Sequence, residues 1–354
     1  MPIALSQLVA RCLSGVVLAF ALGANPLHAK DAPEAIAVDG SFKAAEQAGK
    51  LLRAAEGRVL KDIKKIAVPL FSVEFVIADS ERAETSGFAS AGRASTSVSY
   101  KLKGVEEADF QAITATLYEQ FLTDIRAAGI EVVSLDKVST APTYKKLIAS
   151  GVPSPIRSSS ALTFAPPGMS IYGFSKTQTG GTSSGASFFG ALSQMGAGFG
   201  GVSAAMDTVT LQQELDATVV EIQMKVNFVQ LTNLNKGFLG RLSNTATVEG
   251  KVSPSVATAT FSVQSSATRG SLTLTNPLAL DSAAFSDVRK KPATTGDIVG
   301  GVAAILLRAA AGNKDSSSSE DLEAIADPAK YRQIVGNGLA TVNQMFLQRL
   351  KVGE

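Results

Sequence analysis

The sequence predicts an α+β fold, with a mixed sheet flanked by helices, a β-rich second half and a C-terminal helix. Three observations predict this class. The first half places a strongly apolar strand before a long amphipathic helix, which is the order of an α/β layer. The second half carries several runs in which apolar and polar residues alternate, as they do in an antiparallel meander. The chain then closes with an amphipathic helix pattern that opens at Asp327-Pro328.

The first elements are a helix, a strand and a weak hairpin. A helix is expected over about Ser41–Lys61, because its large residues form one apolar stripe. The stripe consists of Leu51, Leu52, Ala55 and Val59. Residues Ile66–Ala78 are rich in Val, Ile and Phe, and this near-continuous apolar run predicts a strand covered on both faces. Residues 79–99 are rich in Ser, Ala and Gly and predict a loop or a hairpin with weak edges.

The clearest helix pattern covers about Glu106–Ala128 and ends before Gly129, a residue type common just after helices. Its apolar residues recur at steps of three or four, which places them on one face. They are Phe110, Ile113, Leu117, Phe121 and Ile125. A short strand over Ile130–Val133 and a short helix over Thr143–Ala149 are expected to follow.

A long strand is expected over Val209–Leu231, where alternation predicts one buried face and one solvent-facing face. The apolar members are Val220, Ile222, Met224, Val226 and Phe228, and the polar members are Glu221, Gln223, Lys225 and Asn227. Shorter strands over Thr245–Val252, Val256–Val263 and Ser271–Thr275 complete the predicted meander.

The C-terminal part is expected to be helical. Residues Ile298–Ala311 form an apolar run that predicts a helix, and Ser316–Ser319 predict a loop. A final helix begins at Pro328 and presents one apolar side, because its large residues recur with helical spacing. These residues are Tyr331, Ile334, Val335, Leu339, Val342, Phe346 and Leu350.

The composition divides the chain into four parts. Residues 1–29 form a leader, residues 30–150 an α/β portion, residues 151–206 an insertion loop rich in Pro, Gly and Ser, and residues 207–354 a β-rich portion with C-terminal helices. Residues 30–354 also fit a single domain.

The leader predicts export. Arg11 supplies a charged start, Leu13–Leu22 an apolar run, and Leu27–Ala29 a small-residue cleavage site, with Ala24 as an alternative site. We therefore expect a mature protein in the periplasm or associated with the outer membrane. Cleavage at Ala29 removes Cys12 and His28, the only cysteine and the only histidine. This loss excludes thiol, zinc and Ser-His-Asp mechanisms for the mature chain.

The charge balance excludes one class of partner. The chain has 33 Lys and Arg against 31 Asp and Glu, and it contains no long basic run. No nucleic-acid partner is expected from that balance. The densest basic stretch, Arg289–Lys291, precedes Pro292 and predicts a solvated turn, with an anionic surface as the alternative contact.

Two motifs have the spacing of reactive or binding sites. Ser134 and Lys137 have the S-x-x-K spacing of a serine nucleophile with a lysine base, but the companion motifs are missing, so Ser134 is interpreted as the end of a strand. The run Gly196–Gly201 satisfies G-x-G-x-x-G within a Gly- and Ser-rich stretch and is interpreted as a flexible apolar loop. No cofactor is expected.

The acidic residues are interpreted as helix-start signals. Glu106, Glu107 and Asp109 lie in the first turn of the long helix, where the helix dipole and capping favour negative charge. The run Ser319–Asp321 and the residue Asp327 are interpreted in the same way. No metal site is expected from any of these positions.

The Gly-rich span 173–201 carries more large apolar residues than a linker needs. We expect these residues to contact a partner or a ligand. The candidates are Phe174, Phe188, Phe189, Leu192 and Phe199.

One stretch of the chain resembles a known domain. Residues Lys64–Phe71 read KKIAVPLF, residues Leu122–Gly129 read LTDIRAAG, and residues Ile130–Val133 read IEVV. This strand–helix–strand pattern resembles the periplasmic α/β domain of curli-secretion channel (CsgG-type) proteins and of TolB N-terminal-type proteins. The resemblance implies an envelope protein with a sheet-and-helix unit. It carries over no functional residue, and the lipidated cysteine of the curli channel has no counterpart here.

Three functions remain open from the sequence. The first is a non-enzymatic exported protein that acts in envelope assembly, secretion or maintenance through contacts with an envelope protein, a membrane surface or further copies of itself. The second is a periplasmic carrier of a lipid or another apolar ligand. The third is a hydrolase with a Ser-Lys or dicarboxylate site that needs no histidine.

Overall fold

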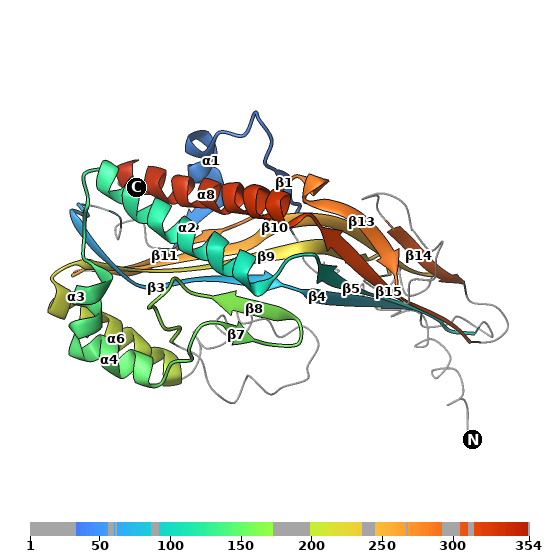
Figure 1. The fold of residues 1–354 in the computed structure, drawn as a ribbon, viewed down its shortest axis with the longest axis horizontal. Coiled ribbons are helices and arrows are strands. Elements are labelled where there is room, and N and C mark those ends of the chain that lie inside the picture. The colour runs from blue at the N-terminus through green and yellow to red at the C-terminus, as the bar shows by residue number, and fades with distance from the viewer. Residues whose placement is uncertain are drawn as a thin grey trace, which may run out of the picture. The chain divides into compact units, whose positions relative to one another are not determined.

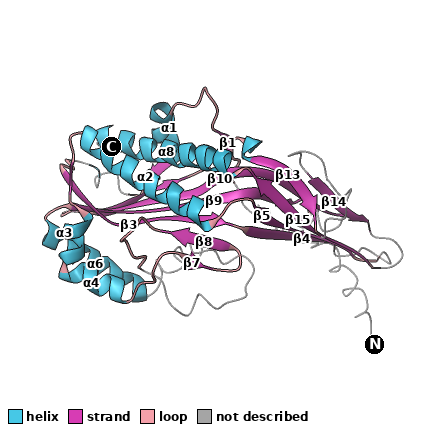
Figure 2. Cartoon of the chain, in the orientation of Figure 1, coloured by secondary structure: helices cyan, strands magenta, loops and turns pink. Residues whose placement is uncertain are grey.

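The computed structural model describes residues 33–55, 60, 62–85, 92–172, 199–235, 245–266, 268–291, 305–310 and 315–352. Residues Pro33–Glu354 form one compact unit. The predicted leader lies outside the described residues. Within the unit, strands form two sheets and helices cover one of them, so the α+β class is confirmed (Figure 2).

The larger sheet has eleven described strands and crosses both halves of the chain, in the order β1-β12-β10-β9-β3-β8-β7, with β11, β14, β2 and β6 joined to this path. The strands are β1 (Ile36–Ala37), β2 (Leu52–Ala54), β3 (Lys65–Val76), β6 (Glu131–Val132), β7 (Ile156–Arg157), β8 (Ala161–Phe164), β9 (Thr218–Asn233), β10 (Thr245–Gln264), β11 (Arg269–Leu274), β12 (Leu278–Ala279) and β14 (Ile305–Ala310). The parallel pairing of β3 with β9 joins the two halves, because it places residues of the first half in register with residues 218–226.

The smaller sheet has four strands in the order β13-β15-β5-β4. They are β4 (Ala78–Glu84), β5 (Ala94–Lys103), β13 (Phe285–Lys290) and β15 (Ser316–Ala326). β15 runs parallel to β5, so strands distant in sequence form its centre. One face is buried against the β9–β10 pair, where Tyr100 lies so close to Gly250 that a side chain at that position would collide with the tyrosine ring.

The described helices are α1 (Ala44–Leu51), α2 (Glu107–Ala127), α3 (Leu135–Thr140), α4 (Pro142–Ala149), α6 (Phe199–Leu215) and α8 (Pro328–Val352), with a 3-10 turn at Ser282–Ala284. Figure 1 shows α2 and α8 lying along one face of the larger sheet. The long helix and the final helix were both predicted at these positions, and both are confirmed.

Aromatic side chains join the two long helices to the sheet. Phe75 stacks on Phe110 with ring centroids 4.6 Å apart, and Phe261 stacks on Phe346 at 4.2 Å with nearly parallel planes. Such pairs add about 0.5–1.5 kcal/mol to the free energy gained from burial alone. All four rings are almost completely buried. Strand β3 itself is buried along nearly its whole length, as the sequence predicts.

Several predicted elements were wrong because tertiary pairing decided their form. The expected helix over Ser41–Lys61 ends at Leu51, since the next three residues pair with β11. The apolar run expected as a helix after Ile298 contains β14, which pairs with β10 at Ile305–Ala310; residues 298–304 and 311 lie outside the described part of the chain. Short apolar runs fit either structure, and a strand partner decides between them.

Residues 316–319 and the start of the strand predicted from Val209 also differ from the sequence prediction. The serines of 316–319 are not a loop but open β15, because they pair in register with Ala94–Ser97. The predicted strand from Val209 begins only at Thr218. Before it, α6 buries Leu211 and Leu215, which are one helical turn apart, and ends near Asp216, whose φ is 46°. For residues 79–99 the sequence left a loop and a hairpin open, and the structure shows the hairpin, in which β4 and β5 pair antiparallel.

We predict a modest loss of stability when the start of α8 is uncapped. The Asp327 carboxylate accepts hydrogen bonds from the backbone N–H groups of Ala329 (3.0 Å) and Lys330 (3.1 Å). Replacing a capping Asp by Ala costs about 1 kcal/mol in the free energy of unfolding. Asp327→Ala should show that loss in urea denaturation, whereas Asp327→Asn should retain most of the stability. Equal stability of all three proteins would contradict a capping role.

Candidate functional site

The face of the larger sheet that α2 and α8 leave uncovered carries polar side chains on its central strands. Strand β9 contributes Gln223, Lys225 and Asn227 at alternate positions. Strand β3 places Ser72 and Glu74 in register with Gln223 and Lys225. Strand β10 places Thr258 in register with Lys225. Since alternate residues share one face of a strand, these six side chains form one surface, which we call the polar face.

The polar face is largely buried, although the sequence predicted that its β9 residues would face solvent. Ser72 and Glu74 are each 1% exposed, and Gln223 is 6% exposed. The prediction of a solvent-facing side for β9 is therefore wrong at its centre. Polar groups that leave water lose hydration, and only hydrogen bonds or opposite charges offset that loss.

One ion pair lies at the centre of the polar face. The Lys225 ammonium is 3.3 Å from the Glu74 carboxylate, and the two side chains are 16% and 1% exposed. Both charges come from adjacent, parallel strands, so the register of the sheet fixes their approach. A buried pair of this kind is costly to break, because removal of one charge takes away an attraction that offsets the lost hydration of the other.

Three oxygen atoms of the polar face have no hydrogen-bond partner among the described residues. They are Ser72 Oγ, Asn227 Oδ1 and Thr258 Oγ1. A buried polar atom without a partner costs about 1–3 kcal/mol, and native proteins contain few of them. The three side-chain oxygens beside this ion pair therefore have unused hydrogen-bonding capacity.

Burial raises the pKa values of acidic groups at both ends of the polar face. Burial raises the pKa of Asp79, the first inward-facing acid of β4, and nearby Lys225 opposes that shift. At the other end, burial raises the pKa of the half-buried Glu221, although the Tyr172 hydroxyl donates a hydrogen bond to it at 2.7 Å. Burial also raises the pKa of Tyr172 well above its ordinary value.

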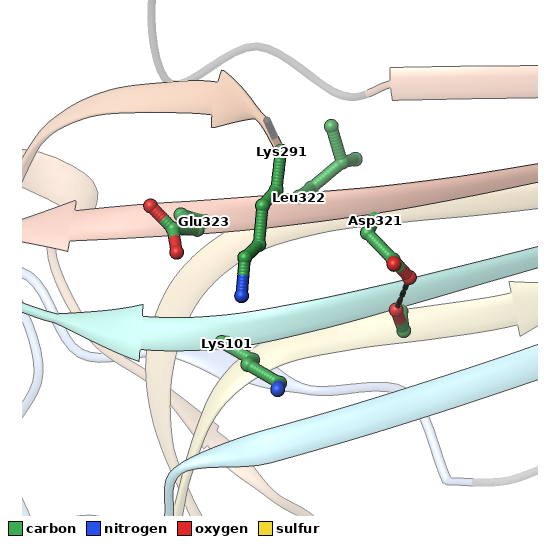
Figure 3. A pocket seen from close by; sticks show the side chains of 6 residues that line it. Lys101, Lys291, Asp321, Leu322 and Glu323 are labelled. Atoms are coloured by element: carbon green, nitrogen blue, oxygen red, sulfur yellow. Dashed lines mark hydrogen bonds between the residues drawn. The ribbon is translucent and has the colours of Figure 1, made fainter. Parts of the chain in front are cut away.

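A second candidate lies on the outer face of the smaller sheet, where a shallow hollow of about 210 Å³ is lined by Ser99, Lys101, Lys291, Asp321, Leu322 and Glu323 (Figure 3). Lys101 comes from β5, Asp321 and Glu323 from β15, and Lys291 follows β13. The Ser99 hydroxyl donates to the Asp321 carboxylate in a short hydrogen bond. Basic and acidic groups therefore alternate across neighbouring strands around this hollow.

The apolar residues predicted to contact a partner are not placed by the structure. Phe174, Phe188, Phe189 and Leu192 lie outside the described residues, and Phe199 is the first residue of α6. The Gly-rich motif 196–201 likewise lies partly outside them, and its described end forms the start of that helix.

The proposed Ser-Lys pair has a structural role. The Ser134 hydroxyl accepts a hydrogen bond from the backbone N–H of Lys137 at 3.3 Å, so it caps the start of α3, and both residues are exposed. The interpretation of Ser134 as the end of a strand was wrong, because a helix begins there.

The acidic cluster at the start of α2 is also structural. Glu106 and Asp109 form a reciprocal capping box, as the sequence predicted for helix-start acids. Asp109 also pairs with Arg332 of α8 at 3.2 Å, and Glu107 pairs with Arg157 at 2.6 Å. The Arg157 hydrogen bond holds the pKa of Glu107 below its ordinary value.

Two charged runs were assigned to the wrong elements. Ser319–Asp321 is not a helix start but lies within β15. Arg289 and Lys290 end β13 rather than forming a turn, and they pair with Asp287 (2.8 Å) and Glu320 (2.9 Å). Only Lys291 follows the strand, and it lines the hollow.

The described residues contain no group of three or more His, Cys, Asp or Glu placed to hold a metal ion. None of their helices combines the length and the apolar character that a membrane span requires.

The sequence does contain a signal for the polar face. Ser72 and Glu74 interrupt an otherwise apolar strand at alternate positions, which indicates a polar patch within a buried layer.

Fold and site together define an α+β protein with a polar face on its central sheet. Comparisons with protein-family models, curated proteins and solved structures found no match for this chain. The resemblance to the curli-channel and TolB-type domain therefore stays a prediction.

Proposed function

We propose that this chain is a non-enzymatic exported protein of the cell envelope that acts through contact with another envelope protein. The outer face of the smaller sheet is the proposed contact surface. The observation that carries the proposal is the hollow of about 210 Å³ in which Lys101 and Lys291 lie beside Asp321 and Glu323 (Figure 3). A surface of alternating charge is suited to a polypeptide that presents the complementary pattern, since electrostatic complementarity favours the correct partner and disfavours others.

The same surface gives less support to a membrane contact. Anionic lipid attracts clusters of basic residues. Here Arg289 is paired with Asp287, and Arg82 with Glu84 at 2.6 Å, so two of the basic groups on this face are already neutralised. The acidic residues of β15 lie between the basic residues of its two neighbours, which interrupts any basic patch.

The alternative functions have weaker support. A hydrolase needs reactive groups that converge, whereas Ser134 caps α3 and Glu106, Glu107 and Asp109 are engaged in a capping box and in ion pairs. A carrier of an apolar ligand needs an apolar surface beside the sheet, whereas the described face opposite α2 and α8 is polar at its centre.

Export is tested first. The full chain and a version lacking residues 2–29 are produced in a Gram-negative host, and the envelope and cytoplasmic fractions are compared. The expected result is a mature protein in the envelope fraction, with mass spectrometry giving Lys30 as its first residue. Full-length protein confined to the cytoplasm would refute the envelope location.

Contact is tested by site-specific photo-crosslinking in the same cells. A crosslinking amino acid at Ser319, an exposed position on the outer face, should give a discrete adduct with one envelope protein. The same group at Thr116, an exposed position on α2, should not. The double variant Lys101→Glu/Lys291→Glu should abolish the Ser319 adduct while leaving the melting temperature nearly unchanged. An adduct that survives this charge reversal, or no adduct at all, would refute the proposed surface.

A further inference from the structure

The hollow on the outer face of the smaller sheet has the size of a site for a few side chains. Its volume of about 210 Å³ lies below the roughly 300–1,000 Å³ of pockets that enclose small-molecule ligands. Strands β15 and β5 and the end of β13 line it, and it is open to a segment that crosses these strands (Figure 3). The hollow therefore suits side chains of a polypeptide, and the inference drawn from it rests on the contact surface proposed above.

The hollow contains charges that the described part of the protein does not neutralise. Neither Lys101 nor Lys291 forms an ion pair with a described residue. Glu323 likewise forms none with a described residue. The Asp321 carboxylate accepts a hydrogen bond from the Ser99 hydroxyl, which leaves its charge without a counter-charge. Both lysines and both acids are therefore available to a partner.

Strand pairing fixes the order of these charges. Glu323 of β15 is in register with Lys101 of β5. On the other side of β15, the Lys291 backbone N–H donates a hydrogen bond to the Asp321 carbonyl at 2.9 Å. The two acids of β15 therefore have a lysine on each flank, so the order across the three strands is lysine, acid, lysine.

The spacing of these charges matches an extended chain. Lys101 and Lys291 are two strands and two residues apart, which places their backbones roughly 12 Å apart at about 4.8 Å per strand and about 3.3 Å per residue. Alternate residues of an extended segment point to one side, and its first and fifth residues are about 13 Å apart. A segment that lies diagonally over the strands therefore places its first, third and fifth side chains near Lys291, the two acids and Lys101 in turn.

We propose that the hollow binds an extended segment of the partner protein that carries acidic, basic and acidic side chains at alternate positions. The two acidic side chains meet Lys291 and Lys101, and the basic side chain meets Asp321 and Glu323. A purely acidic or purely basic segment would meet like charges at part of the hollow, and like charges repel. The surface therefore recognises a pattern of charge rather than a net charge.

Three labelled peptides test this pattern on the purified protein. TETKTET presents acid, base and acid at alternate positions, TKTETKT presents the reverse, and TTEEKTT has the composition of the first without its alternation. Fluorescence anisotropy at low salt should show roughly tenfold tighter binding of TETKTET than of either other peptide, since each exposed ion pair changes the affinity by up to about fivefold. High salt should reduce the difference, because salt screens exposed charges.

Matched variants connect the preference to the hollow. Lys101→Glu/Lys291→Glu should remove the preference for TETKTET. Lys64→Glu/Lys145→Glu makes the same change in net charge at exposed positions outside the hollow and should keep the preference. Circular dichroism confirms that each variant is folded.

The results distinguish this inference from the proposed function. No binding of TETKTET, equal binding of the three peptides, a preference that survives Lys101→Glu/Lys291→Glu, or one that is lost in Lys64→Glu/Lys145→Glu would overturn the charge pattern. A Ser319 adduct without the peptide preference would leave the contact surface standing and refute only the pattern. Absence of that adduct would refute the contact surface itself.

Discussion

The protein should unfold steeply as the pH rises above about 10, the ordinary pKa of a tyrosine. All five tyrosines are at most 5% exposed. Burial raises the pKa of every one of them, and it raises that of Tyr118 to about 12. Each phenol therefore stays protonated in the folded protein at a pH where it ionises in the unfolded chain.

The direction of this effect follows from proton linkage. A group whose pKa is higher in the folded state stabilises the fold below the unfolded pKa and loses that contribution as the pH rises toward the folded pKa. Each tyrosine removes up to about 1.4 kcal/mol per pH unit while the pH lies between its unfolded and its folded pKa, and the losses of the five tyrosines add. Because a domain of this kind is stable by about 5–15 kcal/mol, we expect the summed loss to unfold it at alkaline pH.

Circular dichroism and phenolate absorbance, followed together during alkaline titration, measure this transition. The two signals should change at the same pH, because ionisation requires unfolding. Tyr331 and Tyr100 serve as controls, since neither hydroxyl has a hydrogen-bond partner among the described residues. Tyr100→Phe/Tyr331→Phe should keep the stability at neutral pH and move the transition to higher pH. Phenolate absorbance that rises while the fold stays intact would contradict the burial of these phenols.

The second large effect is expected at the central ion pair. Lys225→Met removes the counter-charge of Glu74, whose side chain is 1% exposed, and should lower the free energy of unfolding by about 3–5 kcal/mol. Urea denaturation at neutral pH measures the loss. The double variant Glu74→Leu/Lys225→Met removes both charges and should recover part of the stability, because no charge then loses hydration at this place in the sheet.

The pH dependence of Lys225→Met provides a further check. Protonation of the Glu74 carboxylate removes the negative charge that Lys225 balances, so the deficit of the variant should shrink as the pH drops into the range in which carboxylates take up protons. A deficit that stays constant with pH, or a double variant no more stable than Lys225→Met, would show that packing rather than charge causes the loss.

Local sequence signals were sufficient where an element stabilises itself. The helix over Glu107–Ala127 has a regular apolar stripe and a capping box, and the final helix has a capping Asp327 and an N-terminal proline. Strand β3 was identified because its apolar run is long and rich in β-branched and aromatic residues. These elements were predicted within a few residues of their observed ends.

Pairing between distant segments could not be predicted in the same way. The serines of 316–319 have no strand character of their own and become β15 only beside β5, more than 200 residues away in sequence. The alternation of Glu221, Gln223, Lys225 and Asn227 was recognised correctly as one face of a strand. Its burial depended on what covers that face, which the strand's own sequence does not encode.

The sequence by itself determined the fold class, the helices α2 and α8 and the central apolar strand β3, because each depends on composition or on periodicity within one segment. Only the tertiary structure decided that Glu74 meets Lys225, that Ser134 and Glu106 are caps, and that Lys101 and Lys291 share a hollow. The physical reason is that these contacts arise from the register between strands and from the burial of faces, and both properties belong to pairs of segments rather than to either segment alone.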